Sequence, residues 1–163
     1  MSWRIRPARP DDLDAVMRLE RTSFPTDAWS TAQMREEFRS PYGHYVVAET
    51  TDEAPEPVLV GYAGFSSLPG GHDGDVQTIA VAADHRGQGL GRALFRELLD
   101  EAARRDVREV FLEVRADNPV AQAMYRSFGF EAIGTRPRYY QPDDVDALVM
   151  RGSVRDRTTG GTA

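Results

Sequence analysis

The chain has 163 residues, of which 40% are hydrophobic and 28% are charged, a balance typical of one globular domain with a sizeable core. It contains no cysteine, which excludes a disulfide framework, a cysteine nucleophile and a thiolate metal site. No apolar run reaches the roughly 18 residues that span a bilayer, and the N-terminus lacks the apolar core of a signal peptide. We therefore expect a cytoplasmic protein without a membrane partner.

The formal net charge of −6 predicts which partners the chain attracts. A negative field repels phosphate backbones and attracts cations, so we expect no direct nucleic-acid partner and favour an amine or a basic peptide. No lysine occurs, which excludes Schiff-base chemistry and the lysine of a Walker phosphate loop. The three histidines match no metal-ligand spacing, so we expect no metal.

The first part of the chain alternates strand and helix patterns. The acidic residues after Pro10 favour a helix start, and Ser30–Gln33 has the capping-box pattern that begins a second helix. Apolar residues at helical spacing are expected to be buried on these helices: Leu13, Val16, Met17, Met34 and Phe38. Short apolar runs predict strands around Ile5, over Tyr45–Ala48 and over Val58–Phe65. The acidic segment Thr50–Pro57 is expected to form a turn.

The second part continues the alternation. Strands are predicted over Val76–Val81, Val110–Val114, Phe130–Gly134 and Ala147–Met150. A long helix is expected after Gly91, with Leu94, Leu98 and Leu99 buried, and another from Pro119 to near Gly129. The segment Leu68–Gly74 is predicted to be a flexible loop. Residues 153–163 are expected to form a disordered polar tail, which leaves residues 1–152 as a single domain.

Glycines alternate with other residues directly before the long helix, in the segment Arg86-Gly87-Gln88-Gly89-Leu90-Gly91. Glycine lets backbone N–H groups approach an anion closely, and a helix N-terminus adds partial positive charge. A dinucleotide fingerprint would need glycine at position 92, where Arg92 stands, and a Walker loop would need lysine. The pattern favours a phosphate or pyrophosphate ligand, while a glycine-rich turn without a ligand remains open on this segment alone.

This segment resembles the pyrophosphate loop of the GCN5-related N-acetyltransferase (GNAT) family. Further motifs resemble its bacterial ribosomal-protein-alanine N-acetyltransferase branch: Leu112–Asn118, Ala121, Tyr125, Gly129-Phe130, Arg136–Tyr140, and Asp146-Ala147 with Met150. The resemblance covers roughly residues 5 to 151. It implies the α/β (α+β) GNAT fold, in which helices flank a central mixed, mostly antiparallel sheet that is splayed between its fourth and fifth strands. The chain departs from the branch at Pro25–Trp29 and at Val145.

The resemblance also implies acetyl-CoA as co-substrate. The residues expected to bind its pyrophosphate are Arg86, Gly87, Gln88, Gly89, Leu90, Gly91 and Arg92. The pantetheine arm is expected to pair with the main chain of Ile79, Ala80 and Val81, where this strand splays from the next. Asn118 is expected to contact the cofactor arm, although its place before Pro119 also fits a helix N-cap, and the two roles are compatible.

Acetyl transfer of this kind is a direct attack of an amine on a thioester and needs no acyl-enzyme. Glu113 is the candidate base, because a carboxylate inside an apolar strand would be partly desolvated, although strand alternation would also allow it to face solvent or Arg115. Tyr125 is the candidate partner of the leaving sulfur. Packing as a core aromatic explains Tyr125 as well.

A protein α-amino group has a pKa about 2.5 units below that of lysine, so its deprotonation costs about 3.4 kcal/mol less. This favours the α-amino group of a protein N-terminus as acceptor, as the ribosomal-protein-alanine branch implies. Four aromatic residues are candidates for a peptide slot, with plain core packing an equal alternative: Phe24, Trp29, Tyr139 and Tyr140.

Two other functions stay open at this stage. The same fold could acetylate a small-molecule amine such as a polyamine or an aminoglycoside, or serve as a non-catalytic acetyl-CoA-binding subunit. The presence of both Glu113 and Tyr125 disfavours the non-catalytic alternative. We expect a monomer or a weak dimer.

Overall fold

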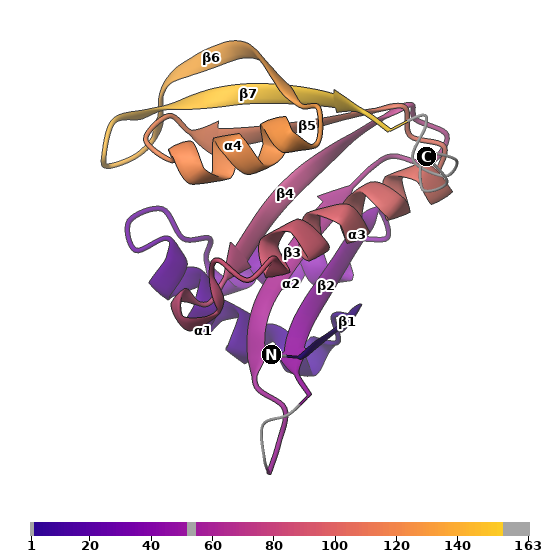
Figure 1. Ribbon diagram of the computed structural model, residues 1–163, viewed down its shortest axis with the longest axis vertical. Coiled ribbons are helices and arrows are strands. Elements are labelled where there is room, and N and C mark those ends of the chain that lie inside the picture. The colour runs from indigo at the N-terminus through magenta and orange to yellow at the C-terminus, as the bar shows by residue number, and fades with distance from the viewer. Residues whose placement is uncertain (1, 52–54, 155–163) are drawn as a thin grey trace. The chain divides into compact units, whose positions relative to one another are not determined.

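The computed structural model describes residues 2–51 and 55–154, and the strands within them form one mixed sheet in the order β1-β2-β3-β4-β5-β7-β6 (Figure 1). The strands are β1 (Trp3–Pro7), β2 (Gly43–Thr50), β3 (Leu59–Ser66), β4 (Asp73–Val81), β5 (Glu109–Arg115), β6 (Glu131–Tyr140) and β7 (Val145–Ser153). The α-helices are α1 (Leu13–Ser23), α2 (Thr31–Arg39), α3 (Leu90–Arg104) and α4 (Pro119–Ser127). Short 3-10 helices cover Pro10–Asp12 and Ala83–His85.

The chain divides into two compact units. The first contains the residues up to Ser66 together with Gln77–Leu98, and the second contains Ser67–Val76 together with the residues from Leu99 onward. Strand β4 and helix α3 therefore each contribute to both units.

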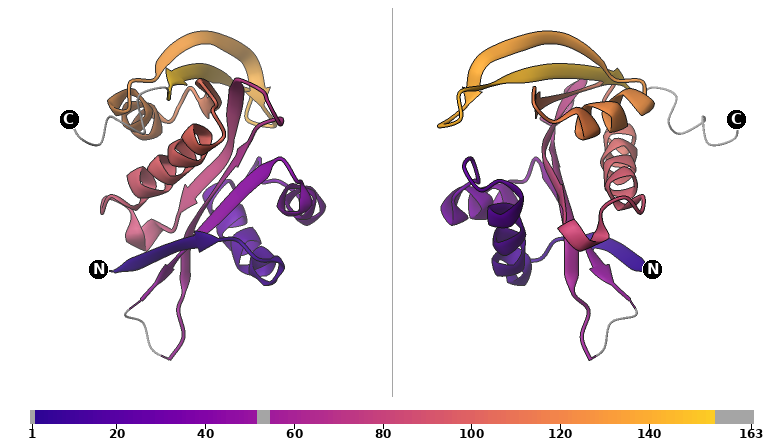
Figure 2. Two further views of the ribbon diagram at one scale, coloured as in Figure 1. Left: turned by 90° about the vertical axis from the view of Figure 1, so that its right-hand side faces the viewer. Right: turned by 60° about the vertical axis from the view of Figure 1, so that its left-hand side comes forward.

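The first unit is a sheet with helices on both faces (Figure 2). β1 pairs antiparallel with β2, and β2 pairs antiparallel with β3. The neighbouring β3 residues Gly61 and Tyr62 point to opposite faces. A Cβ atom at Gly61 would lie 3.0 Å from Leu94 of α3, whereas Tyr62 belongs to the buried cluster that packs α1 and α2. α3 therefore covers one face, and α1 and α2 cover the other.

The helices of this unit form as the sequence predicts. Ser30 caps α2: its hydroxyl accepts from the Gln33 N–H, and the Gln33 side chain accepts from the Ser30 N–H, which confirms the capping box. Three of the residues predicted to be buried on α1 and α2 are confirmed, and they share the cluster with Tyr62: Val16, Met17 and Met34. Leu13 and Phe38 pack against the same cluster but are only half-buried.

The second unit is built on β5, β6, β7 and the start of β4. β5 pairs antiparallel with β7 along its whole length, and β7 pairs antiparallel with β6. β4 runs parallel to β5 through only three residue pairs, from Asp73 with Glu109 to Asp75 with Phe111, as a splay between the fourth and fifth strands predicts. α4 begins at its cap Asn118 and is followed by Gly129 at φ +87°, a value that suits glycine.

Element boundaries differ from several sequence predictions. Thr50 belongs to β2 and not to the predicted turn, because it pairs with Trp3 and its N–H donates to Val58 O, and α3 begins at Leu90 rather than after Gly91. β4 begins at Asp73, because His72 O accepts from the N–H groups of Arg108 and Glu109 and starts the pairing there, so Asp73 and Gly74 do not belong to a loop. β6 extends to Tyr140, six residues beyond the predicted end. β7 runs through Ser153 and Val154 is buried, so these two residues belong to the folded part and not to the predicted tail.

Some predictions fall outside the described residues: the tail from residue 155 onward, and residues 52–54 of the predicted turn. In the parts of the chain that are described, no helix combines the length and apolar character needed to cross a membrane. The same ranges contain no group of three or more His, Cys, Asp or Glu residues that could hold a metal ion.

Candidate active site

The first unit carries the glycine-rich loop between β4 and α3. The Ala82 N–H donates to Val60 O, which holds the end of β4 on β3, and the Arg86 Nε donates to Val81 O across the loop. Leu90 is buried, and its side chain would lie 3.4 Å from a Cβ atom at Gly61. Leu90 thus anchors the loop to the sheet, and only its main chain is available to a ligand.

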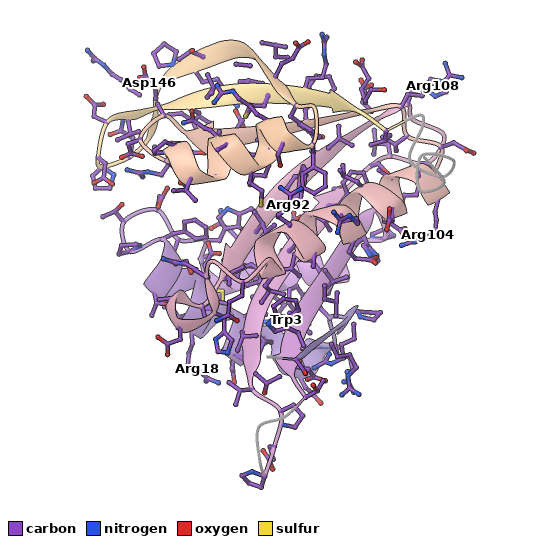
Figure 3. All side chains as sticks on the ribbon, viewed as in Figure 1. Trp3, Arg18, Arg92, Arg104, Arg108 and Asp146 are labelled. Atoms are coloured by element: carbon purple, nitrogen blue, oxygen red, sulfur yellow. The ribbon has the colours of Figure 1, made fainter. Side chains whose placement is uncertain are left out.

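Two glycines of this loop adopt left-handed conformations, with φ +74° at Gly87 and φ +88° at Gly89. A Cβ atom built at either residue meets nothing within 4 Å, so the space in front of the loop is open. α3 begins directly afterwards at Leu90, and the first N–H groups of a helix have no intrahelical acceptor. Figure 3 shows Arg92 on the N-terminal part of this helix. Open space, glycines and a helix N-terminus fit a pyrophosphate.

The strand before the loop contributes Ile79, Ala80 and Val81. Ala80 is buried in the cluster on the α1–α2 face, and its carbonyl oxygen lies next to Gly61 of β3. Phe24 and Trp29 pack against the same cluster and stay half-buried. These two aromatic residues therefore pack on a cluster that includes Ala80 of β4. They have part of the core role that the sequence left open.

The second unit carries Glu113 in the middle of β5, opposite Val149 of β7. Its side chain is 29% exposed, and its Oε2 lies 2.5 Å from Nη1 of Arg136 on β6. Glu113 therefore lies in a partly exposed ion pair, and not in the apolar surroundings that the sequence suggested. The other alternative, pairing with Arg115, is wrong, since the Arg115 guanidinium binds Asp117 and Asp143.

Tyr139 and Tyr140 lie near this ion pair in the second unit. The Arg136 guanidinium carbon lies 4.2 Å from the centre of the Tyr139 ring, and Tyr139 meets Tyr140 edge to face at 5.1 Å. Arg115 lies over the Tyr140 ring at 5.3 Å. Cation–π contacts of this kind hold aromatic rings in place. The two tyrosines and Glu113 thus belong to one surface cluster, which Arg136 connects.

Tyr125 lies on α4 and is 5% exposed, so the core position that the sequence allowed is confirmed. Burial raises the pKa of its phenol, and Tyr140 adds a smaller effect in the same direction. A hydroxyl of this kind stays protonated at neutral pH and can donate a hydrogen bond. Asn118 Oδ1 accepts from the Ala121 N–H at 3.2 Å, which confirms its role as N-cap.

Three residues near these sites were not among the candidate site residues, and two of them, Arg136 and Asp146, were noted only as parts of family-like motifs. Arg136 meets Glu113 only because β6 folds onto β7, and Asp146 of β7, marked in Figure 3, accepts from the Arg138 N–H in the same hairpin. Asp75 of β4 has a raised pKa because it is desolvated, with Asp73 and Glu113 adding to the effect. The neighbours of these three residues depend on which strands pair and in which register. Sequence spacing does not predict this pairing.

Comparisons with known proteins agree with this arrangement. The family model described as "Acetyltransferase (GNAT) family" matches residues 13–130. N-alpha-acetyltransferase RimI of Mycobacterium tuberculosis is 46% identical over 132 residues, which cover 80% of this chain and 78% of that protein. A Bacillus subtilis protein, whose name assigns it to the ribosomal protein bS18-alanine N-acetyltransferases, is 35% identical over 153 residues, 93% of this chain and 96% of that protein.

A Mycobacterium leprae protein is 45% identical over 147 residues, which cover 87% of this chain but only 38% of that longer protein. Among solved structures, the ribosomal-protein-S18-alanine N-acetyltransferase of Escherichia coli matches with a TM-score of 0.82 at 28% identity, and 94% of each chain is covered. Since the family model covers more than half of the sequence, the chain belongs to the acetyltransferase (GNAT) family.

Proposed function

We propose that this chain transfers the acetyl group of acetyl-CoA to the α-amino group of a protein N-terminus, with a ribosomal protein that begins with alanine as acceptor. The observation that carries this proposal is the similarity to two named relatives over most of their length, the RimI protein of M. tuberculosis and the B. subtilis protein. Family membership supports acetyl transfer, and the names of the relatives support the acceptor. A cytoplasmic location follows from such an acceptor and remains a prediction.

The loop from Arg86 to Arg92 is the proposed pyrophosphate site. Main-chain N–H groups of Gly87, Gly89 and the first turn of α3 would bind the phosphate oxygens, and the open space in front of both glycines leaves room for them. The Arg92 guanidinium would add a positive charge near this helix end. The main chain of β4 from Ile79 to Val81 would pair with the pantetheine arm.

In the proposed reaction the neutral amine attacks the thioester carbonyl carbon, the N–C bond forms and the C–S bond breaks. Glu113 accepts the proton that the amine nitrogen loses, and the Tyr125 hydroxyl donates a hydrogen bond to the thiolate as it leaves. Arg136 occupies one carboxylate oxygen of Glu113. The acceptor enters as an ammonium group and would compete with the Arg136 guanidinium for the Glu113 carboxylate. The ammonium group then loses its proton.

Aromatic residues are the proposed contacts of the acceptor peptide. Phe24 and Trp29 are half-buried against the cluster that contains Ala80, and Tyr139 is 43% exposed beside Arg136. Half-buried aromatic rings provide apolar contact area at low entropic cost, as peptide-binding surfaces require. The negative net charge of the chain favours the approach of the cationic N-terminus of a ribosomal protein.

The test is a direct comparison of acceptors with the purified chain and acetyl-CoA. One peptide begins with alanine, a second has the same sequence with a blocked N-terminus and an internal lysine, and a polyamine is the third acceptor. We expect mass spectrometry to find one acetyl group on the N-terminal residue of the first peptide. Acetylation of the polyamine alone would favour a small-molecule acetyltransferase, and binding of acetyl-CoA without transfer would favour a non-catalytic subunit.

A further inference from the structure

Glu20 of α1 is a carboxylate that the proposed chemistry does not use. It is 2% exposed, and among the described residues no arginine or histidine lies within ion-pair distance of it. Glu49, which is also buried, binds both Arg4 and Arg6. Desolvation raises the pKa of Glu20, and Asp27 adds to the rise. Burial of a carboxylate without a cation lowers the stability of the fold, so the hydrogen bonds of Glu20 must offset this cost.

The two carboxylate oxygens of Glu20 bind two different segments of the first unit. Oε1 accepts a hydrogen bond from the Tyr62 hydroxyl on β3. Oε2 accepts from the Trp29 N–H at 2.8 Å. Trp29 directly precedes Ser30, the N-cap of α2, so the Glu20 side chain connects α1, the sheet and the start of α2.

The other end of the segment between the two helices is fixed by the last main-chain hydrogen bond of α1, which also ends at residue 20. The Glu20 main-chain oxygen accepts from the Phe24 N–H at 2.9 Å. The segment Phe24–Trp29 is therefore bound to a single residue at both ends, through the main chain at Phe24 and through the side chain at Trp29. Its two terminal aromatic rings pack on the cluster that contains Tyr62 and Ala80.

We infer that Glu20 is a positioning residue for the acceptor peptide: it fixes the conformation of Phe24–Trp29, the segment whose rings would contact the first residues of the acceptor. This inference rests on the proposed function. A buried polar group that is costly in stability but fully hydrogen-bonded specifies one conformation among several. If the competent conformation fell to a tenth of its population, the apparent affinity for the peptide would fall about tenfold.

The test replaces Glu20 by leucine, which keeps the burial and the size but removes both acceptors. We expect Glu20→Leu to raise KM for a peptide that begins with alanine about tenfold, with kcat and the Kd of acetyl-CoA within about twofold of wild type. Glu20→Gln should restore most of the affinity, because its amide oxygen accepts from the Trp29 N–H while its amide N–H donates to the Tyr62 oxygen. Glu36→Leu, the same replacement on an exposed part of α2, is the matched control.

An unchanged KM in Glu20→Leu, or an equal defect in Glu20→Gln, would overturn the inference. Should Glu20→Leu not fold, Tyr62→Phe removes only the hydroxyl that orients the carboxylate. That variant should still raise the peptide KM severalfold and speed hydrogen exchange at the Trp29 amide, and wild-type values of both would count against the inference. Peptide acetylation by the wild-type chain is measured first, so a failure of the proposed function is seen before any variant is compared.

Discussion

The Arg136 guanidinium and the Glu113 carboxylate form an ion pair of 2.5 Å between Nη1 and Oε2. Arg136 is more than half exposed and lies at 4.2 Å from the centre of the Tyr139 ring, so its side chain is held from two sides. The pair places a cation at the oxygen to which an acceptor amine would deliver its proton. It therefore orients the proposed base and competes with the substrate for it.

Replacement of the proposed base tests this arrangement. We expect Glu113→Gln to lower kcat roughly 100-fold, because general-base catalysis contributes at least that factor, and to leave the Kd of acetyl-CoA near the wild-type value. Steady-state kinetics and calorimetry measure the two quantities. Glu109→Gln is the control, since Glu109 lies on the same strand and pairs with Arg151 at the surface. A wild-type kcat in Glu113→Gln would remove Glu113 from the mechanism.

Arg136 should act only through Glu113. We expect Arg136→Gln to lower kcat roughly tenfold, because the carboxylate loses the contact that orients it. The double variant Glu113→Gln with Arg136→Gln should be no slower than Glu113→Gln alone, since the contact is already lost. Additive losses in this double-mutant cycle would show that Arg136 has a separate role.

Most of the fold follows from short-range patterns in the sequence. The capping box at Ser30, the proline after Asn118 and the helical spacing of Leu94 and Leu98 each act within one or two turns of chain, and all are confirmed. The boundaries of β4 and β6 were less predictable. They depend on hydrogen bonds to His72 and to β7, which lie outside the segments themselves.

The candidate site likewise has a local part, which the sequence pattern predicts, and contacts between residues distant in sequence, which it does not predict. The glycine loop is a local feature that the sequence pattern marks directly, and two of its glycines, Gly87 and Gly89, adopt positive φ. The ion pair of Glu113 and Arg136 joins residues that are 23 positions apart, and the contact of Glu20 with Tyr62 spans 42 positions. Nothing in the spacing of these residues indicates which strand or helix lies opposite, so tertiary contacts alone determine their partners.

The glycine loop can be tested by adding a side chain. We expect Gly89→Val to raise the Kd of acetyl-CoA by on the order of 100-fold, because the valine fills the open space in front of the loop and displaces hydrogen bonds to charged oxygens worth about 1.5–3 kcal/mol each. The positive φ of Gly89 adds a strain of about 1–2 kcal/mol. Calorimetry with acetyl-CoA measures the affinity.

Gly70→Val is the matched control for this strain. Gly70 has φ +74° and equally open surroundings, but it lies in the connection before β4, outside the glycine loop. Both variants should lose similar stability in thermal unfolding, while only Gly89→Val should lose acetyl-CoA. Equal losses of affinity would mean that strain, and not the occupied space, explains the effect.

The Tyr125 hydroxyl is expected to stabilise the leaving thiolate. Tyr125→Phe should lower kcat roughly tenfold, the worth of one hydrogen bond, and change KM little. Because burial raises the phenol pKa, the hydroxyl stays protonated below about pH 10, so the pH–rate profile of the variant should be lower but unshifted. A shifted alkaline limb would instead assign a titrating role to Tyr125, and full activity would show that its hydroxyl is dispensable.

Glu49 predicts a specific loss of stability in acid. The hydrogen bond from Arg4, followed by that from Arg6, holds its pKa below the ordinary value. A carboxyl group with a lowered folded-state pKa stabilises the fold above its unfolded pKa of about 4.3, and this contribution is lost as the pH falls through the folded value. Glu49→Gln should therefore lower the free energy of unfolding at neutral pH by about 1–3 kcal/mol.

The same variant should flatten the dependence of stability on pH below about pH 4.3, since one carboxylate no longer titrates there. Urea unfolding at a series of pH values measures both effects. Glu36→Gln on the exposed part of α2 should leave the wild-type curve unchanged. If Glu49→Gln and wild type lost stability in parallel as the pH falls, the ion pairs of Glu49 with Arg4 and Arg6 would not be the acid-sensitive contacts of this fold.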